Sequence, residues 1–239
     1  MKFLEFGQSK KVIVFLHGWG ASKETFLWTK NYFDEYKKIY VDFAGFGESP
    51  EPSKVFCLSD YVFDLKKLVD GFEIEELVLV GHSFGGRVAI KFAYLFQNEY
   101  QNLKLCLVDS AGIKPRLSVF KKYQIWKYKR LKDKAKNNAS LEEKLKSYGS
   151  TDYKSLSGVM RKTFVKIVNE DLYPLLKFVV CKVCLVWGDK DKDTKVWMAK
   201  RMKRSFKDSQ LFILKNAGHF AYADKPKEFL IILDTFIKN

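Results

Sequence analysis

A chain of 239 residues in which 47% are hydrophobic and 30% charged has the composition of a folded globular protein, because disordered chains carry fewer apolar residues. No apolar run approaches the roughly 18 to 20 residues that span a bilayer, and residues 1–11 lack the apolar region of a secretion signal. We therefore expect a cytoplasmic protein without a transmembrane segment. The net charge of +15 leaves nucleic acid, membrane surfaces and acidic small molecules to be weighed as partners.

Short apolar runs alternate along the chain with longer amphipathic stretches, a pattern typical of parallel strands joined by crossover helices. Helical spacing predicts helices over 58–72 and 87–96, and a proline begins a last predicted helix over 226–237. The apolar runs are nearly continuous, which indicates strands covered on both faces. Six runs are predicted as strands: 12–16, 38–42, 77–81, 103–109, 183–187 and 210–214.

The alternation breaks between Gly112 and about Leu176. Residues 113–166 hold 16 lysines and arginines against 4 acidic residues, so most of the excess positive charge lies in this segment. Aromatic and aliphatic side chains interleave with the lysines at roughly helical spacing. We predict a helical cap over 113–176, inserted into one core formed by 1–112 and 177–239.

The four cysteines are too few and too scattered for a disulfide framework. Cys181 and Cys184 have C-x-x-C spacing but fall in a run that we interpret as a buried strand. Residues three apart on a strand point to opposite faces. We therefore expect these two thiols to pack in the core and to share neither a metal nor a disulfide.

The sequence GHSFGG at 81–86 directly follows a predicted strand and precedes a helical stretch. It contains G-x-S-x-G in the context that gives this motif its meaning, a strained strand-to-helix turn that exposes the serine hydroxyl. The glycines permit close backbone packing around such a turn. We predict that Ser83 is a covalent nucleophile; the alternative is a glycine-rich turn without a chemical role.

A serine hydroxyl needs a base within hydrogen-bond reach and a third group that orients the base. The chain has three histidines. His82 adjoins the serine and is expected to point away from it, and at His17 we expect the backbone rather than the side chain to matter. His219 lies between the last strand and the last helix, in a loop at the same carboxyl edge of the sheet as Ser83, where chemistry gathers in open α/β sheets. His219 is the predicted base.

The orienting acid is expected between Ser83 and His219 in chain order, at another strand end. The segment that follows the strand 183–187 offers Asp189, Asp191 and Asp193, and Asp109 ends the preceding strand. Sequence order does not choose among these four.

Negative charge develops on a carbonyl oxygen during nucleophilic attack and needs preorganised N–H donors. One expected donor is the amide after the nucleophile, that of Phe84. The second is expected from the loop HGWG at 17–20, and we assign it to the amide of Trp19.

Taken together, these motifs resemble the α/β-hydrolase superfamily, specifically its small cap-bearing serine hydrolases. The resemblance covers nearly the whole chain. It rests on HGWG at 17–20, DFAGFGES at 42–49, the serine motif at 81–86, G-x-x-D at 188–191 and G-H at 218–219.

The resemblance implies an α/β-hydrolase fold, a mostly parallel sheet flanked by helices, with the helical cap inserted after the sixth strand of the family's sheet. It also implies that Asp191 is the acid and that the amides of Trp19 and Phe84 bind the oxyanion. Such a mechanism requires no metal or organic cofactor.

The predicted function is therefore cleavage of an ester or thioester of a small carboxylic acid through an acyl-enzyme on Ser83. Relatives that open epoxides or remove halide carry aspartate as nucleophile, so Ser83 argues against both reactions. A carbon-carbon bond hydrolase of ring-cleavage diketo acids is an alternative, although such enzymes usually have tryptophan where this chain has Phe220. Acyl transfer to an acceptor other than water would use the same three side chains, Ser83, His219 and Asp191.

The basic cap has two interpretations, a lid that attracts an anionic small-molecule substrate or an ordinary solvated surface. A further alternative is a non-catalytic protein that uses the cap to bind an anionic surface. The sequence has no nucleic-acid-binding signature, so we expect no nucleic-acid partner. It does not specify an oligomeric state.

Overall fold

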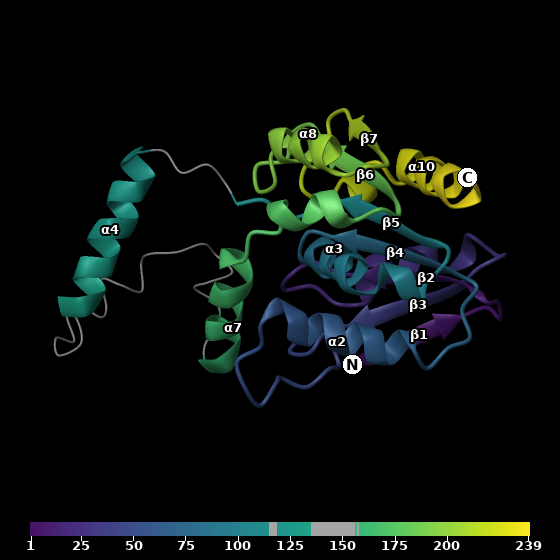
Figure 1. Ribbon diagram of the computed structural model, residues 1–239, viewed down its shortest axis with the longest axis horizontal. Coiled ribbons are helices and arrows are strands. Elements are labelled where there is room, and N and C mark those ends of the chain that lie inside the picture. Colours follow the sequence, from purple (N-terminus) through teal and green to yellow (C-terminus); the bar gives the residue numbers. More distant parts are fainter. Residues whose placement is uncertain (115–118, 135–155, 157) are drawn as a thin grey trace.

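The computed structural model describes residues 1–114, 119–134, 156 and 158–239 (Figure 1). Its centre is a seven-stranded sheet with the strand order β1-β3-β2-β4-β5-β6-β7. Only β1 is antiparallel to its neighbour, and every other pairing is parallel. The strands are β1 (Lys2–Phe6), β2 (Lys11–Leu16), β3 (Lys37–Asp42), β4 (Glu76–His82), β5 (Leu103–Val108), β6 (Lys182–Gly188) and β7 (Ser209–Leu214).

All six predicted strands are present, each within one residue of its expected bounds. Strand β1 was not predicted, because its side chains are mostly exposed and it lacks a continuous apolar run. β7 was wrongly expected to be covered on both faces. It has only β6 as a neighbour, and its Phe212 and Ile213 are exposed, since an edge strand lies at the margin of the covering helices.

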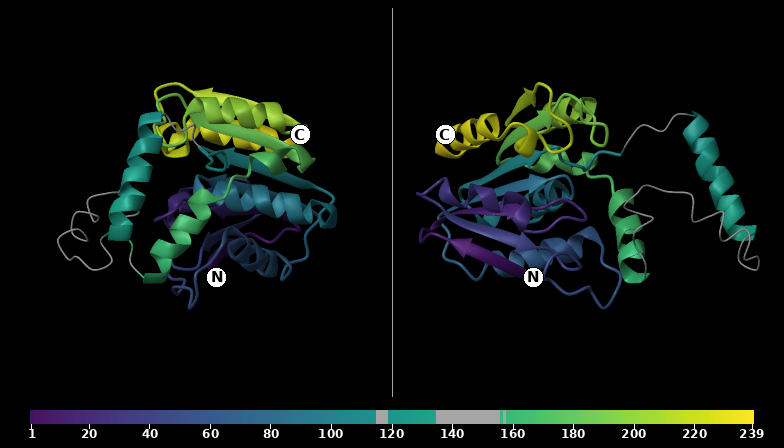
Figure 2. Two further views of the ribbon diagram at one scale, coloured as in Figure 1. Left: turned by 60° about the vertical axis from the view of Figure 1, so that its left-hand side comes forward. Right: turned by 180° about the vertical axis from the view of Figure 1, so that it is seen from behind.

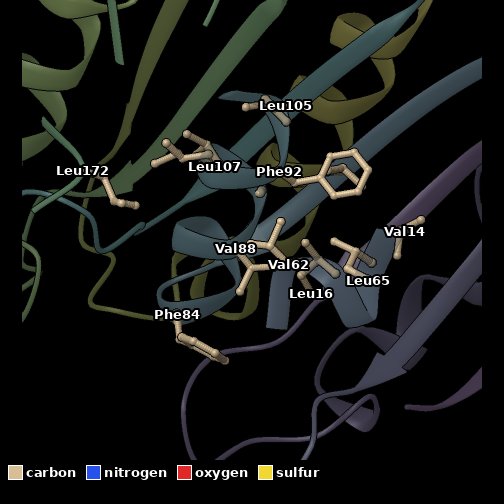
Figure 3. Close-up of a cluster of buried hydrophobic side chains, with 14 of the residues drawn as sticks. Val14, Leu16, Val62, Leu65, Phe84, Val88, Phe92, Leu105, Leu107 and Leu172 are labelled. Atoms are coloured by element: carbon tan, nitrogen blue, oxygen red, sulfur yellow. The ribbon is translucent and has the colours of Figure 1, made fainter. Parts of the chain in front are cut away.

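Helices cover both faces of the sheet (Figures 1 and 2). Side chains that alternate along β2 enter two separate buried clusters, which is the period-two pattern of a strand between two layers. One cluster joins the sheet to α2 (Leu58–Val69), α3 (Phe84–Phe96) and α8 (Val196–Ser205), and the other joins it to α1 (Glu24–Leu27) and α10 (Pro226–Lys238). Figure 3 shows the first cluster, in which Leu16 and Val14 of β2 lie near Val62 and Leu65 of α2.

Shorter helices complete the described chain. They are η1 (Trp28–Asn31), η2 (Gln97–Glu99), η4 (Tyr173–Phe178) and α9 (Ala221–Asp224). Within the range predicted as a cap, the structure describes α4 (Val119–Lys134) and α7 (Gly158–Asn169), while much of the rest lies outside the described residues. No helix in the described ranges is long and apolar enough to cross a membrane.

Candidate active site

Ser83 occupies a sharp turn between β4 and α3. Its backbone has φ 48° and ψ −105°, a combination that costs energy for a residue with a side chain and that often marks functional sites. The turn also needs a glycine at 85, because a Cβ there would overlap the carbonyl oxygen of Leu16 at the end of β2. The G-x-S-x-G spacing therefore reflects close packing of the turn against the sheet.

The structure brings Ser83, His219 and Asp191 together at the carboxyl edge of the sheet. Nε2 of His219 lies 3.1 Å from Oγ of Ser83, and Nδ1 of His219 lies 2.9 Å from Oδ2 of Asp191. A carboxylate only accepts hydrogen bonds, so Nδ1 carries the proton and Nε2 presents a lone pair to the serine hydroxyl. The three side chains thus form a continuous hydrogen-bonded relay.

The Asp191 carboxylate is fixed by its own loop. Oδ1 accepts the backbone N–H groups of Asp193 and Thr194 at 2.8 and 2.9 Å, and Oδ2 lies 2.7 Å from the Thr194 hydroxyl. Sequence reasoning missed Thr194; its signal was a threonine three residues after an aspartate, the spacing at which a side chain closes a turn. These hydrogen bonds therefore hold the Asp191 carboxylate in a fixed position beside His219.

The electrostatics of the pair agree with this geometry. Burial lowers the pKa of His219, but the hydrogen bond to Asp191 and the charge of that carboxylate outweigh burial, so the pKa lies above the ordinary 6.5. Burial raises the pKa of Asp191, and the hydrogen bonds from His219 and Thr194 outweigh it, so this pKa lies below its ordinary value. At neutral pH the relay therefore holds an ionised acid beside a strong histidine base.

Of the three other acids that the sequence left open, Asp189 and Asp193 are exposed. Asp109 is fully buried, and its two carboxylate oxygens accept the backbone N–H groups of Gly188 and Ala221, each at 2.9 Å. Burial raises the pKa of Asp109 to about 7, despite the opposing effect of these two hydrogen bonds. Asp109 thus ties together the loops that carry Asp191 and His219, which sequence reasoning did not foresee.

The side chains of His82 and His17 both form hydrogen bonds with backbone groups of loops that lie beside Ser83. Nε2 of His82 lies 2.7 Å from the backbone oxygen of His219, so this side chain contacts the histidine loop. The expectation that only the backbone matters at His17 is wrong. Its buried ring lies 2.7 Å from the carbonyl oxygen of Gly18 through Nδ1 and accepts the N–H of Phe43 through Nε2. Burial lowers the pKa of His17 to about 4, so the ring is neutral when it pins the loop 17–20.

The loop 17–20 lies alongside the serine turn. A Cβ on Gly18 would lie 2.7 Å from Nδ1 of His82 and 3.6 Å from Cβ of Ser83. The ring of Trp19 packs against the ring of Phe84 at 5.3 Å between centroids. The two residues expected to bind an oxyanion through their amides therefore come from neighbouring segments beside Ser83.

Helix α7 packs over this edge of the core. Its Phe164 contacts Trp19 at 5.1 Å between ring centroids, and the hydroxyl of its Thr163 accepts the N–H of Phe56. Met160 and Ile167 of α7 are buried. Phe164 therefore adds an aromatic side chain from α7 to the apolar surroundings of the site.

Asp191, Asp193 and His219 also offer ligand atoms within 4.8 Å of one another, the spacing of a metal site. In this structure, however, one oxygen of Asp191 faces Nδ1 of His219 and the other faces two N–H donors. These hydrogen bonds account for the close approach of the Asp191 and His219 atoms.

Comparison with known proteins matches residues 13–231 to the model of the alpha/beta hydrolase family. The protein YisY of the AB hydrolase superfamily from Bacillus subtilis is 24% identical over 94% of this chain and 90% of its own length. Lipase 1 of Psychrobacter immobilis is 24% identical over 93% of this chain and 77% of its own length. An esterase from Exiguobacterium antarcticum superposes with a TM-score of 0.76 at 21% identity, covering 99% of this chain and 95% of the esterase chain.

The fold and the family match give one identification: the chain belongs to the alpha/beta hydrolase family. The predicted superfamily and fold class are confirmed. Family membership supports a hydrolase activity.

Proposed function

We propose that this protein is a serine hydrolase that cleaves an ester or thioester of a small-molecule carboxylic acid through an acyl-enzyme on Ser83. The observation that carries the proposal is the relay from Ser83 Oγ to His219 Nε2, and from His219 Nδ1 to Asp191 Oδ2. Nucleophile, base and orienting acid at these separations are the arrangement that activates a serine hydroxyl.

In the first half of the reaction, Ser83 Oγ attacks the carbonyl carbon of the substrate while its proton passes to His219 Nε2. The Asp191 carboxylate stabilises the imidazolium that forms. Backbone N–H groups of Trp19 and Phe84 are the proposed donors to the oxyanion, each worth about 3 to 4 kcal/mol in such sites. The tetrahedral intermediate then collapses, the imidazolium protonates the departing alcohol or thiol, and an acyl ester remains on Ser83.

The second half of the reaction repeats these steps with water. His219 takes a proton from the water as it attacks the acyl carbon, and the imidazolium returns the proton to Ser83 Oγ as the carboxylic acid leaves. The same groups act twice, so this half of the mechanism needs no further residue.

The surroundings of Ser83 support an acyl group with apolar character. Aromatic rings of Trp19, Phe46, Phe84 and Phe164 pack on one another next to the serine turn. We propose that 113–176 acts as a cap that contributes Phe164 to the acyl-binding side of the site. The core would then consist of 1–112 and 177–239.

The decisive experiment is mass spectrometry after incubation with a fluorophosphonate, combined with hydrolysis of p-nitrophenyl esters of short, medium and long acyl chains. We expect one adduct on Ser83 and ester turnover in the wild type. Ser83→Ala is expected to lose the adduct and about a millionfold in kcat. Ser205→Ala, which changes a serine at the end of α8, is the matched control and is expected to behave as wild type.

An unlabelled Ser83 and no ester turnover in a folded wild-type protein would contradict the proposal. Turnover of a diketo acid in place of the esters would show that Ser83, His219 and Asp191 catalyse carbon-carbon bond cleavage instead. Faster release of the acyl group to an added alcohol than to water would make the protein an acyltransferase.

A further inference from the structure

Helix α4 concentrates positive charge. Its 16 residues include seven lysines and arginines and a single acidic residue, Asp133. Nothing in the proposed ester cleavage uses this helix. A segment of one sign attracts anions over distances comparable to the Debye length, about 8 Å at physiological salt.

The same helix exposes aromatic side chains in an ordered stack. The rings of Tyr123 and Trp126 stack with their centroids 5.7 Å apart, and the guanidinium of Arg130 lies 4.3 Å from the centroid of the Trp126 ring. Because these residues are three and four positions apart, they lie on one side of the helix. Tyr123 is 56% and Trp126 46% exposed, and Lys127 and Arg130 are exposed as well. This surface, Tyr123, Trp126, Lys127 and Arg130, is called the α4 face below.

Figures 1 and 2 show α4 beyond α7, on the side of the molecule away from the core helices α8 and α10. Helix α7 contacts the site through Phe164 and Trp19. The α4 face therefore belongs to the same inserted segment that borders the candidate active site.

We propose that the α4 face docks the protein on the surface of an anionic phospholipid bilayer. Tryptophan and tyrosine have an apolar ring body and a polar tip, which suits the level of the lipid headgroups. Lysine and arginine beside them bind headgroup phosphates, and each basic residue near an anionic membrane strengthens binding. The sequence has no nucleic-acid-binding signature, so the aromatic and basic side chains of the α4 face favour a bilayer over a nucleic acid.

This proposal goes beyond ester cleavage and does not depend on it, since docking requires no turnover. The test uses the full chain carrying Ser83→Ala, so that the lipids stay intact. Vesicles of phosphatidylcholine alone and of equal parts phosphatidylcholine and phosphatidylglycerol are floated with the protein. We expect flotation with the anionic vesicles only, and a loss of binding as salt is raised.

Two matched charge reversals test whether the α4 face is responsible. Lys127→Glu with Arg130→Glu is expected to weaken binding to anionic vesicles by about tenfold or more. Lys200→Glu with Lys203→Glu changes two exposed lysines of α8 by the same amount of charge and is expected to reduce binding by no more than about twofold. In the Ser83 form of the enzyme, both pairs are expected to retain the wild-type rate on short water-soluble esters.

A third variant tests the contribution of the aromatic rings. Tyr123→Ala with Trp126→Ala preserves all the charges and is expected to reduce vesicle binding several-fold while circular dichroism stays unchanged. The proposal is overturned if the wild type does not float with anionic vesicles, or if the α4 and α8 charge reversals weaken binding equally. Tighter binding to duplex DNA or RNA than to the vesicles would also overturn it.

Discussion

The carboxyl edge of the sheet and the helices α4 and α7 are built in different ways. Around Ser83 the loops are joined by buried hydrogen bonds: Ser83 donates its N–H to Val108, and Ala111 donates its N–H to Ser83. Asp109 bridges two further loops. By contrast, α7 is held by a few buried side chains, and the described side chains of α4 are largely exposed.

This difference separates two kinds of contribution to function. The chemistry proposed for Ser83 requires positions accurate to a fraction of an ångström, and the hydrogen-bonded loops around Ser83 fix such positions. A surface that meets a large partner needs charge and exposed aromatic rings more than fixed geometry. Substitutions around Ser83 at the carboxyl edge of the sheet should therefore change kcat, and substitutions in α4 and α7 should change binding.

The largest expected effect tests the acidic end of the relay. Asp191→Asn keeps the size of the side chain but removes the charge that orients and stabilises protonated His219. We expect kcat for p-nitrophenyl esters to fall by about ten-thousandfold. Asp193→Asn, an exposed neighbour in the same loop, is the control and should change kcat little. Equal losses in the two variants would show that Asp191 has no special role.

A smaller loss in kcat is expected at Asp109, which acts by holding loops rather than by touching substrate. In Asp109→Asn an amide N–H2 faces a backbone donor, so one of the contacts to Gly188 and Ala221 is lost. We expect kcat to fall by about tenfold to a hundredfold with KM nearly unchanged. Asp189→Asn is the exposed control.

Asp109→Asn has a second, independent readout. Ionised Asp109 raises the pKa of His219, and because the pKa of Asp109 is itself about 7, the wild-type acidic limb reflects both groups. Asp109→Asn removes this partial charge, so the acidic limb of the kcat/KM profile should move slightly to lower pH. A role confined to the fold would lower the amount of active enzyme and leave the profile in place.

The wild-type pH profile tests the state of the base. As the proposed base, His219 can accept a proton only when it is neutral, and its pKa lies above the ordinary 6.5. As pH falls through that pKa, kcat/KM should fall by about tenfold per pH unit. An acidic limb centred well below 6.5 would mean that Asp191 does not support His219 in solution.

The sequence predicted the parts of this site that depend on local pattern. Near-continuous apolar runs located the buried strands, and the glycines around Ser83 located the turn, because burial and close packing of a turn each leave a pattern in consecutive residues. Strand β1 was not predicted because an exposed antiparallel edge strand has no continuous apolar run. The role of Asp109 was not predicted because its partners Gly188 and Ala221 lie up to 112 residues away in the chain, and no local spacing reports them. Thr194 did have a local signal, its position three residues after Asp191.

The smallest expected effect tests whether helix α7 takes part in the site. Phe164 of α7 contacts Trp19, so Phe164→Ala should remove part of the apolar surface near Ser83. An aromatic contact is worth about 0.5 to 1.5 kcal/mol, so we expect KM for medium-chain esters to rise about two- to tenfold while kcat for short esters is retained. Val165→Ala, at the exposed next position, is the control. A fall in kcat without a change in KM would show that Phe164 acts by positioning the groups around Ser83 rather than by binding the acyl chain. Helix α7 would then contribute to both regions.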